Sequence, residues 1–398
     1  MKLDLLLPLV KRIFLGAGIA ALFLITACGT SQFTASSGWS GVAVGDKEVY
    51  VGTMEGQLVA FDDQRGSRLW DFPRDKGDAR ETFGAIYGSP SIYEGKIYVA
   101  GYNGFVYAID AKTQRPDSEF EIPGDVVNRS IISDVIISNG KAVFGSGSDL
   151  ETGHLHVRDA NDLAAESGAC RYPRKGTIGK VWASPLVIDG VAYFGDFNHF
   201  LYAVSIDDCS LVWSAPVKLG GAIGATPFFH KGTIYVGSFD RTFYAVDALT
   251  GSARSLFEAQ GWFWSGIASD GKRLFIPSLD GFLYAMDIET EEIIWSEDTG
   301  GPIRSTPIVI PHADLNQSRV VVASNSGKLY VLFSGSGNRD DIINLDDDKD
   351  IEAPLSVKLT KQGPVVYFID QDHRIHAINL DAGDYLNQRW PKSTKDDD

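Results

Sequence analysis

The feature that most constrains this chain is a hairpin pattern that recurs along its whole length. Residues 97–110 read IYVAGYNGFVYAID, two runs of alternating apolar side chains on either side of a short turn with Asn and Gly. This alternation predicts strands with one face in a core, and the turn predicts that they pair as a β-hairpin. Closely similar stretches occur at 49–62, 192–205, 234–247 and 274–287.

Three weaker copies complete the series, at 142–159, 320–333 and 365–379. The eight copies end 40 to 49 residues apart, so units of similar size follow one another without a break. A short apolar run stands before each hairpin, and a further run follows it. Four antiparallel strands per unit, repeated around an axis, form a β-propeller. We therefore predict an all-β fold, one eight-bladed β-propeller of four-stranded antiparallel blades over residues 39–391.

The first 28 residues have the pattern of a bacterial lipoprotein signal peptide. Basic residues precede a short apolar run, 13–25, which is too short to span a bilayer. Small residues directly before Cys28 resemble a lipobox, which implies cleavage there and a lipid on the Cys28 sulfur. An ordinary secretory peptide is the alternative. Residues 29–38 are short and polar, as a flexible tether would be, or they could add a strand to the last blade.

The charge of the chain argues against nucleic acid as a partner. The formal net charge is −16, and removal of residues 1–28, which carry three basic residues and one acidic residue, leaves −18. An electric field of this sign repels phosphate backbones. The acidic end of the chain, residues 392–398, is predicted to be disordered.

Two cysteines remain after Cys28. Cys170 and Cys209 fall near the outer strands of neighbouring units, so in an oxidising compartment they could form a disulfide. Two free thiols are the alternative, because a sequence does not determine the separation of the Cβ atoms.

One motif carries a family resemblance. Residues 60–70 read Ala-x-Asp-x-x-x-Gly-x-x-x-Trp, and parts of this pattern return at 203–213, 245–251 and 285–295. It resembles the repeat of the pyrroloquinoline quinone (PQQ) dehydrogenase propellers. With a lipobox and eight repeats, the chain is most similar to the BamB family of outer-membrane assembly lipoproteins. That resemblance implies a scaffold, not an enzyme, that needs no cofactor and binds protein partners in the cell envelope.

The same resemblance implies a location and an assembly state. The chain would be a monomeric propeller within a complex, anchored by its lipid to a membrane and facing the periplasm or the cell exterior. The membrane would be the outer membrane where the host has one.

A propeller that binds PQQ or another small ligand, as a redox protein, is the alternative function. Quinone dehydrogenases hold PQQ and Ca²⁺ over the propeller centre, commonly beside two adjacent cysteines, and no two cysteines are adjacent here. His154 and His156 share one strand face but lack a third ligand, so solvated histidines are the simpler interpretation. The acidic run 345–350 lacks the Gly and Glu of a calcium loop. We predict no metal site and no catalytic residue.

Propeller geometry indicates where a binding surface should lie. The segments between units and the turns of the hairpins emerge on one face, around the axial funnel. These segments are rich in aromatic and Arg side chains, as protein-binding hot spots are, although the rings could instead fill the funnel. The candidate residues for a partner-binding face are Trp39, Tyr87, Tyr102, Arg129, Trp182, Phe197, His199, Phe239, Arg241, Trp262, Trp264 and Arg304.

Overall fold

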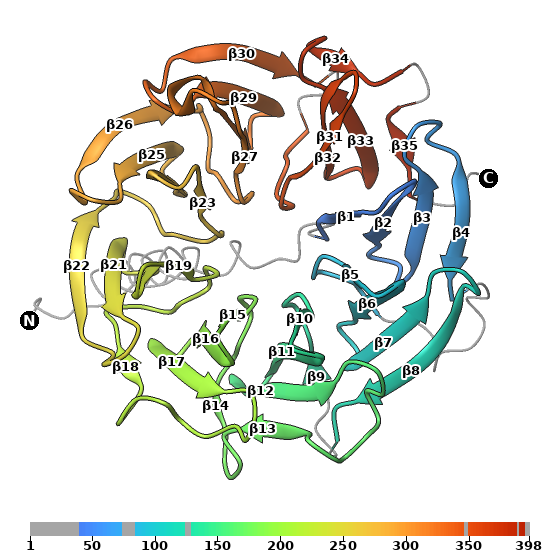
Figure 1. Cartoon of the computed structure of the whole chain (residues 1–398), viewed down its shortest axis with the longest axis vertical. Helices are drawn as coiled ribbons and strands as arrows, with labels where there is room; N and C mark the ends of the chain where they lie inside the picture. Colours follow the sequence, from blue (N-terminus) through green and yellow to red (C-terminus); the bar gives the residue numbers. More distant parts are fainter. Residues whose placement is uncertain (1–39, 74–83, 124–128, 346–348, 388–389, 395–398) are drawn as a thin grey trace, which may run out of the picture. The chain divides into compact units, whose positions relative to one another are not determined.

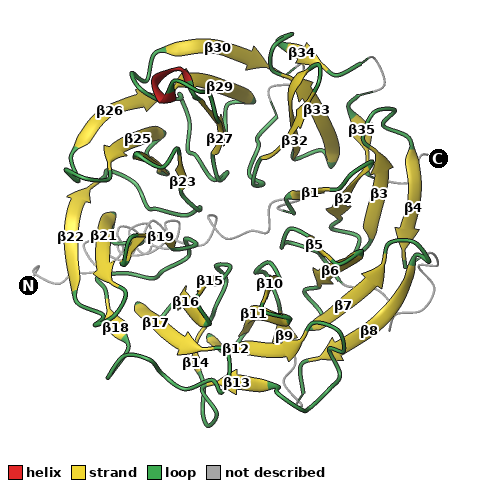
Figure 2. Ribbon diagram, viewed as in Figure 1, coloured by secondary structure: helices red, strands yellow, loops and turns green. Residues whose placement is uncertain are grey.

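The protein is an eight-bladed β-propeller, as predicted, and Figure 1 looks down its axis. The computed structural model describes residues 40–73, 84–123, 129–345, 349–387 and 390–394. Within these residues the only helix is one 3₁₀ turn, η1 (Leu315–Gln317), drawn in red in Figure 2. No helix in this part of the chain is long and apolar enough to cross a bilayer.

Each blade takes its strands in sequence order, from the axis to the rim. Blade 1 contains β1 (Val42–Val44), β2 (Glu48–Gly52), β3 (Leu58–Asp62) and β4 (Arg68–Phe72). Blade 2 contains β5 (Ser91–Tyr93), β6 (Lys96–Ala100), β7 (Phe105–Asp110) and β8 (Arg115–Glu121). Blade 3 contains β10 (Ile136–Ser138), β11 (Lys141–Ser148), β12 (Thr152–Asp159) and β13 (Cys170–Tyr172), and β9 (Arg129–Ser130) and β14 (Ile178–Gly179) pair with its long central hairpin. Blade 4 contains β15 (Leu186–Ile188), β16 (Val191–Gly195), β17 (Phe200–Ser205) and β18 (Val217–Lys218).

The second half of the ring repeats this plan. Blade 5 contains β19 (Phe228–His230), β20 (Thr233–Gly237), β21 (Thr242–Asp247) and β22 (Ala253–Glu258). Blade 6 contains β23 (Ala268–Ser269), β24 (Arg273–Pro277), β25 (Phe282–Asp287) and β26 (Ile293–Asp298). Blade 7 contains β27 (Ile308–Ile310), β28 (Arg319–Ser324), β29 (Lys328–Phe333) and β30 (Arg339–Asn344). Blade 8 contains β31 (Ser356–Thr360), β32 (Gly363–Ile369), β33 (Arg374–Asn379), β34 (Asp384–Tyr385) and the added β35 (Lys392–Ser393).

The central hairpin of each blade is buried on both faces. In blade 2, Ile97 pairs with Ile109 and Val99 with Tyr107, and neither face of these strands reaches solvent. The cause is that each sheet is covered by a neighbouring sheet on either side. The buried apolar residues accordingly form eight clusters, each drawn mainly from two neighbouring blades.

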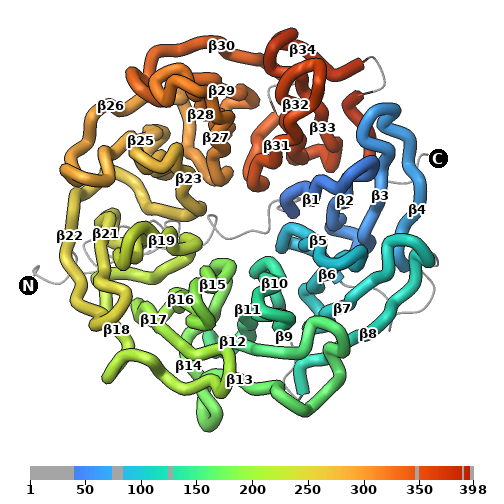
Figure 3. Tube along the Cα trace, viewed as in Figure 1, coloured from blue at the N-terminus to red at the C-terminus, as the bar shows by residue number. Residues whose placement is uncertain are grey.

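The ring closes by packing between the first and last blades. One buried cluster joins Val42 of β1 to Tyr367 of β32. Lys358 of β31 adds polar contacts, because its ammonium donates to the Gly45 carbonyl (2.8 Å) and pairs with the Asp63 carboxylate (2.6 Å). Blade 8 takes all its strands from residues 356–393, which Figure 3 shows beside the start of the ring.

The predicted boundary at the end of the chain is wrong by a few residues. Lys392 and Ser393 form β35 and pair with β33, and Thr394 is buried, so these residues belong to blade 8. Residues 395–398 lie outside the described residues, as do Cys28, the tether 29–38 and Trp39.

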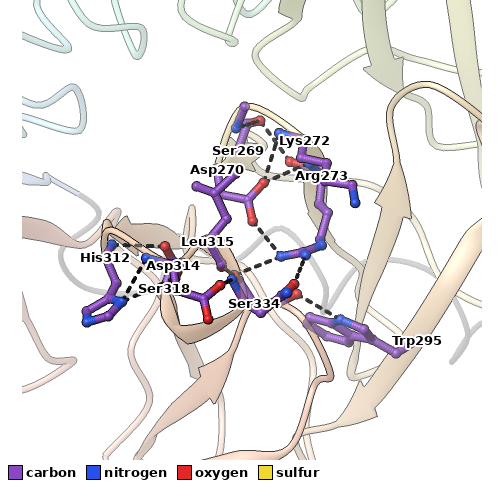
Figure 4. Close-up of polar contacts among 12 residues, drawn as sticks. Ser269, Asp270, Lys272, Arg273, Trp295, His312, Asp314, Leu315, Ser318 and Ser334 are labelled. Carbon is purple, nitrogen blue, oxygen red and sulfur yellow. Dashed lines mark hydrogen bonds and ion pairs between the residues drawn. The ribbon is translucent and has the colours of Figure 1, made fainter.

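A recurring contact near the rim, which we call the interblade joint, ties an outer strand to the next blade. Between blades 4 and 5, the Trp213 indole donates to a backbone carbonyl (3.0 Å), and a Cβ on Gly251 would lie 3.0 Å from the indole ring. Between blades 6 and 7, the Trp295 indole donates to the Ser334 carbonyl (3.0 Å, Figure 4) and its ring lies against Gly337. Both glycines have positive φ, so they allow the turn and the close approach of the ring.

The joint between blades 3 and 4 holds a disulfide at the same two positions. Cys170 lies opposite Val157 in the third strand, in the register that Trp295 has in blade 6. Cys209 (φ 50°) occupies the left-handed turn position that Gly251 has in blade 5. The two cysteines are bonded, with Cα atoms 5.8 Å apart.

A third chemistry fills the joint between blades 5 and 6. Arg254 lies opposite Ala245 of the third strand, and Glu291 (φ 57°) has the turn position. Their side chains form an ion pair at 2.5 Å. The same two positions, one in an outer strand and one in the turn of the next blade, thus hold a tryptophan and a glycine, a disulfide or an ion pair. Each of these pairs brings the edges of two neighbouring blades into contact.

The axis is surrounded by a polar collar, one residue from each of several interblade segments. The Ser89 N–H donates to the Asp134 carboxylate (2.6 Å), the Asp134 N–H to the Ser184 hydroxyl (2.9 Å), and the Gly266 N–H to the Thr306 hydroxyl (3.1 Å). Burial raises the pKa of Asp134, and the hydrogen bonds that it accepts offset this only in part. The collar therefore links neighbouring blades at the axis, but it buries the Asp134 carboxyl group, whose charged form burial disfavours.

Exchange of the Cys170–Cys209 disulfide for a Trp–Gly pair tests whether the two kinds of interblade joint are equivalent. Replacement of both cysteines by serine should lower the free energy of unfolding by up to about 4 kcal/mol, the chain-entropy value for the 39-residue separation. Cys170→Trp with Cys209→Gly should recover a large part of this loss, since it installs the Trp–Gly joint. Urea unfolding followed by tryptophan fluorescence measures both. A Trp–Gly variant no more stable than the serine variant would contradict the equivalence.

Asp134→Asn should stabilise the protein at neutral pH. The folded state raises the pKa of Asp134 above its unfolded value, so stability falls as pH rises through the interval between the two values. Asn still accepts the Ser89 N–H but carries no charge. The melting temperature of the variant relative to wild type should therefore rise between pH 4 and pH 7. If the difference in melting temperature between variant and wild type is the same at pH 4 and pH 7, or if the variant is the less stable protein at pH 7, then the charge of Asp134 does not destabilise the fold.

Candidate functional site

The interblade segments and the hairpin turns meet on one face, which we call the funnel face. In several blades a backbone hydrogen bond ties the turn to the segment before the blade: the Tyr102 N–H donates to Ala85 (2.8 Å), Phe197 to Lys180 (3.0 Å), and Phe239 to Ala222 (2.9 Å). Leu279 and Asn325 repeat the bond in blades 6 and 7. The backbone itself therefore places the candidate side chains of the two sets next to one another.

Five of the candidate rings form a continuous chain, which we call the aromatic arc. Trp182 contacts Phe197 (ring centroids 4.5 Å apart), and Phe197 contacts Phe239 (5.7 Å). Phe239 stacks on both Trp262 (5.0 Å, 9° between planes) and Trp264 (5.4 Å, 11°). All five rings are half-buried. Contacts of this kind contribute about 0.5–1.5 kcal/mol each, so they hold the rings in defined positions before any partner arrives.

Gly224 makes room for the centre of the arc. A Cβ at this position would lie 2.8 Å from the Phe239 ring. The turn that carries Phe239 runs from β20 to β21, and the segments that carry Trp262 and Gly224 flank blade 5 on its two sides. The repeat pattern predicts these rings on one face but does not predict their stacking. The small residue Gly224 is the sequence feature that indicates a close approach there.

Tyr87 and Tyr102 form a separate pair beside blade 2. Their rings are 5.5 Å apart, edge to face, and Tyr102 is 38% exposed. His199 takes a left-handed conformation (φ 75°) in the turn of blade 4, and its carbonyl accepts a hydrogen bond from the Leu219 N–H. The structure thus places these three candidates on the funnel face but not in the arc.

The three candidate arginines each pair with a glutamate. Arg129 contacts Glu121 (2.9 Å) and Arg241 contacts Glu258 (2.8 Å). Such accessible pairs stabilise a fold little and can exchange for a partner's charges.

Arg304 differs, because it pairs with Glu352, whose side chain is 2% exposed. Nothing in the sequence around residue 352 indicated that this carboxylate reaches the funnel. The pair makes the side of the funnel near blades 7 and 8 polar, whereas the arc makes the side near blades 4 to 6 aromatic.

An axial cavity of about 390 Å³ opens within the funnel. Tyr87, Trp182, Trp264 and Arg304 line it, together with the collar residues and Glu352. These rings therefore line the funnel and leave a space in it. The indole N–H of Trp182 is buried without a hydrogen-bond partner in the described part of the chain.

The histidine pair is arranged differently from the expectation. His154 and His156 are neighbours on β12 (ring centroids 5.9 Å apart), but His156 is 3% exposed and hydrogen bonds to the Ser146 hydroxyl (3.0 Å), so it is not solvated. Within the described residues no three His, Cys, Asp or Glu side chains are grouped as metal ligands would be. Residues 346–348 of the acidic run lie outside the described residues.

Comparisons with known proteins identify relatives of two kinds. The family model described as outer membrane protein assembly factor BamB matches residues 29–165 and 198–396. A protein of that name from Alkalilimnicola ehrlichii is 24% identical over 208 residues, which are 50% of this chain and 51% of the relative. The quinohemoprotein alcohol dehydrogenase ADH IIB of Pseudomonas putida is 35% identical over 139 residues, 32% of this chain and 20% of the enzyme. The chain thus spans about half of the first relative and a fifth of the second.

A solved structure agrees on the fold. The crystal structure of BamB from Moraxella catarrhalis superposes with a TM-score of 0.64 over 85% of this chain and 94% of that one, at 18% sequence identity. The matched family model covers all eight blades at least in part, and the propeller fold agrees with it. The chain belongs to the outer membrane protein assembly factor BamB family.

Proposed function

We propose that this chain is an extracytoplasmic scaffold that binds a protein partner through its funnel face during assembly of outer membrane proteins. The proposal adopts for this chain the role that the names of its relatives state. In it the propeller acts as a monomer within a larger complex and carries out no reaction of its own.

The aromatic arc is the observation that carries the proposal. Its five rings are half-buried and held by contacts with one another, so they lose little conformational freedom when a partner covers them. Tyr, Trp and Arg are the residues that dominate protein–protein binding energy. Arg241 lies in the same turn as Phe239, and its exposed ion pair with Glu258 can rearrange toward a partner's carboxylate.

In the same proposal a lipid on Cys28 holds the propeller at a membrane. The apolar run and the small residues before Cys28 support this anchor, and the net charge of −18 on the mature chain supports a partner other than nucleic acid. Residues 29–38 would then set how far the funnel face reaches from the bilayer.

A small-ligand or redox propeller is the second candidate, which the similarity to the alcohol dehydrogenase and the axial cavity favour. PQQ is a tricarboxylate, so a site for it needs positive charge. Asp134 and Glu352 line this cavity. Arg304 is the one basic residue among the described residues that line it, and it already pairs with Glu352. The charge balance of the cavity therefore favours the scaffold.

Truncation of the arc should separate the two candidates. Phe239→Ala and Trp264→Ala should each reduce recovery of the envelope partner with the tagged full-length chain by at least about tenfold, the effect of losing one interface hot spot. Leu249→Ser is the matched control, because Leu249 is 82% exposed in the turn between β21 and β22, on the opposite face. Quantitative mass spectrometry of complexes from solubilised membranes measures recovery.

Equal recovery with all three variants would contradict the proposed face. Dye reduction by the purified chain that depends on added PQQ and Ca²⁺ would overturn the scaffold in favour of the redox candidate.

A further inference from the structure

A buried arginine in blade 3 breaks the pattern of the repeat. The residue before the end of the third strand is apolar and at most 1% exposed in seven blades: Phe61, Ile109, Val204, Val246, Met286, Leu332 and Ile378. In blade 3 this residue is Arg158, at the end of β12, and it is 8% exposed. Its guanidinium lies 3.8 Å from the centre of the Phe120 ring of blade 2. A buried charge at a core position destabilises a fold unless it is well paired.

The pairing of Arg158 is incomplete. One of its terminal nitrogens donates to the Ala165 carbonyl (3.3 Å) and to Glu166 (3.2 Å), but the Glu166 side chain is 87% exposed, so solvent screens that pair.

Arg273 of blade 6 shows what complete pairing looks like in the same propeller (Figure 4). Arg273 is 3% exposed, and it pairs with an Asp270 side chain that is 1% exposed (2.8 Å). It also donates to the Ser334 hydroxyl (3.0 Å) and to Asn316. Arg158 lacks an equivalent buried carboxylate among the described residues.

A second arginine lies on the same face of the sheet. Arg171 of β13 pairs in register with His156, which is two residues before Arg158 on β12. The two guanidinium groups are thus on diagonal cross-strand positions, where like charges repel. Arg171 is exposed, and no described carboxylate forms an ion pair with it.

Both arginines line a cavity of about 510 Å³ at the outer rim between blades 2 and 3. β13 has only three residues and pairs with residues 155–157 of β12, so it ends before it reaches Arg158. Among the described residues that line the cavity, Glu166 is the one acidic residue, and the remaining residues are Phe120, Pro123, His156, Ala169 and Cys170. Burial, and to a smaller extent the neighbouring Arg158 and Arg171, lower the pKa of His156 to about 3.

We propose that this rim cavity is a binding site for a small oxyanion, a carboxylate or phosphate group of a soluble ligand, held between Arg158 and Arg171. Planar guanidinium groups bind such oxygens in pairs. The anion supplies the buried negative charge that Glu166 does not, and it displaces Glu166 from Arg158. The volume of the cavity is in the range of small-molecule sites. The site is at the rim and is separate from the funnel face.

Calorimetric titration of the full-length chain in detergent tests the site, with sodium phosphate in one arm and sodium succinate in the other, each against sodium chloride at equal ionic strength. One of the two anions should bind with a stoichiometry of one. Arg171→Gln should weaken binding at least about tenfold, the effect of losing a charge-assisted hydrogen bond. Arg339→Met is the matched control, because it removes an exposed arginine on β30 and should leave the affinity unchanged.

Arg158→Met distinguishes a binding residue from a structural one. It installs the residue that blade 6 has at this position, so without anion it should match or exceed the wild-type melting temperature, and it should abolish anion binding. The proposal is overturned if neither anion binds to wild type beyond the chloride control, if Arg339→Met weakens binding equally, or if Arg158→Met lowers the melting temperature and leaves binding intact.

Discussion

Lateral packing between neighbouring sheets is the interaction on which the rest of this molecule depends. Each blade leaves both faces of its central hairpin apolar, and only a blade on either side removes both faces from water. No single unit could do this alone, so the chain must close on itself. Closure between β1 and β32 uses the same kind of cluster as the other seven interfaces, and the Lys358–Asp63 pair adds a polar contact there.

The interblade joint shows how tolerant this packing is. A tryptophan on a glycine, a disulfide and an ion pair occupy the same two positions at different interfaces. The packing of neighbouring blades requires contact between an outer strand and a left-handed turn, and residue pairs of several kinds can form that contact. The same tolerance lets blade 3 keep a charged residue at a core position.

The fold could be predicted from sequence because strand alternation is local and the repeat multiplies it. Eight hairpins of similar spacing leave few architectures other than a ring. The pairing of Cys170 with Cys209 was left open, yet the repeat held a further signal: aligned on the hairpins, the two cysteines fall at the Trp and Gly positions of other units. Residues 392 and 393 were predicted to be disordered because they stand beside an acidic run and form a strand of only two residues. The strand β35 is visible only through its pairing with β33, which the sequence pattern does not show.

The candidate site was predictable in outline only. Propeller geometry puts interblade segments and hairpin turns on one face, where five of the candidate rings contact one another. The stacking of Phe239 between Trp262 and Trp264 depends on how two segments approach each other, and so does the contact of Arg304 with Glu352. Such approaches are set by tertiary packing, which the pattern of one strand does not contain.

In the proposed function the partner binds the funnel face, and not the rim or the opposite face. Hydrogen–deuterium exchange of the chain within its membrane complex, compared with the released chain, tests this most directly. We expect slower exchange in the complex at the hairpin turns 196–200 and 238–242 and in the segments 180–184 and 261–265. Slowing confined to the outer strands or to turns of the opposite face, with these four segments unchanged, would contradict the account.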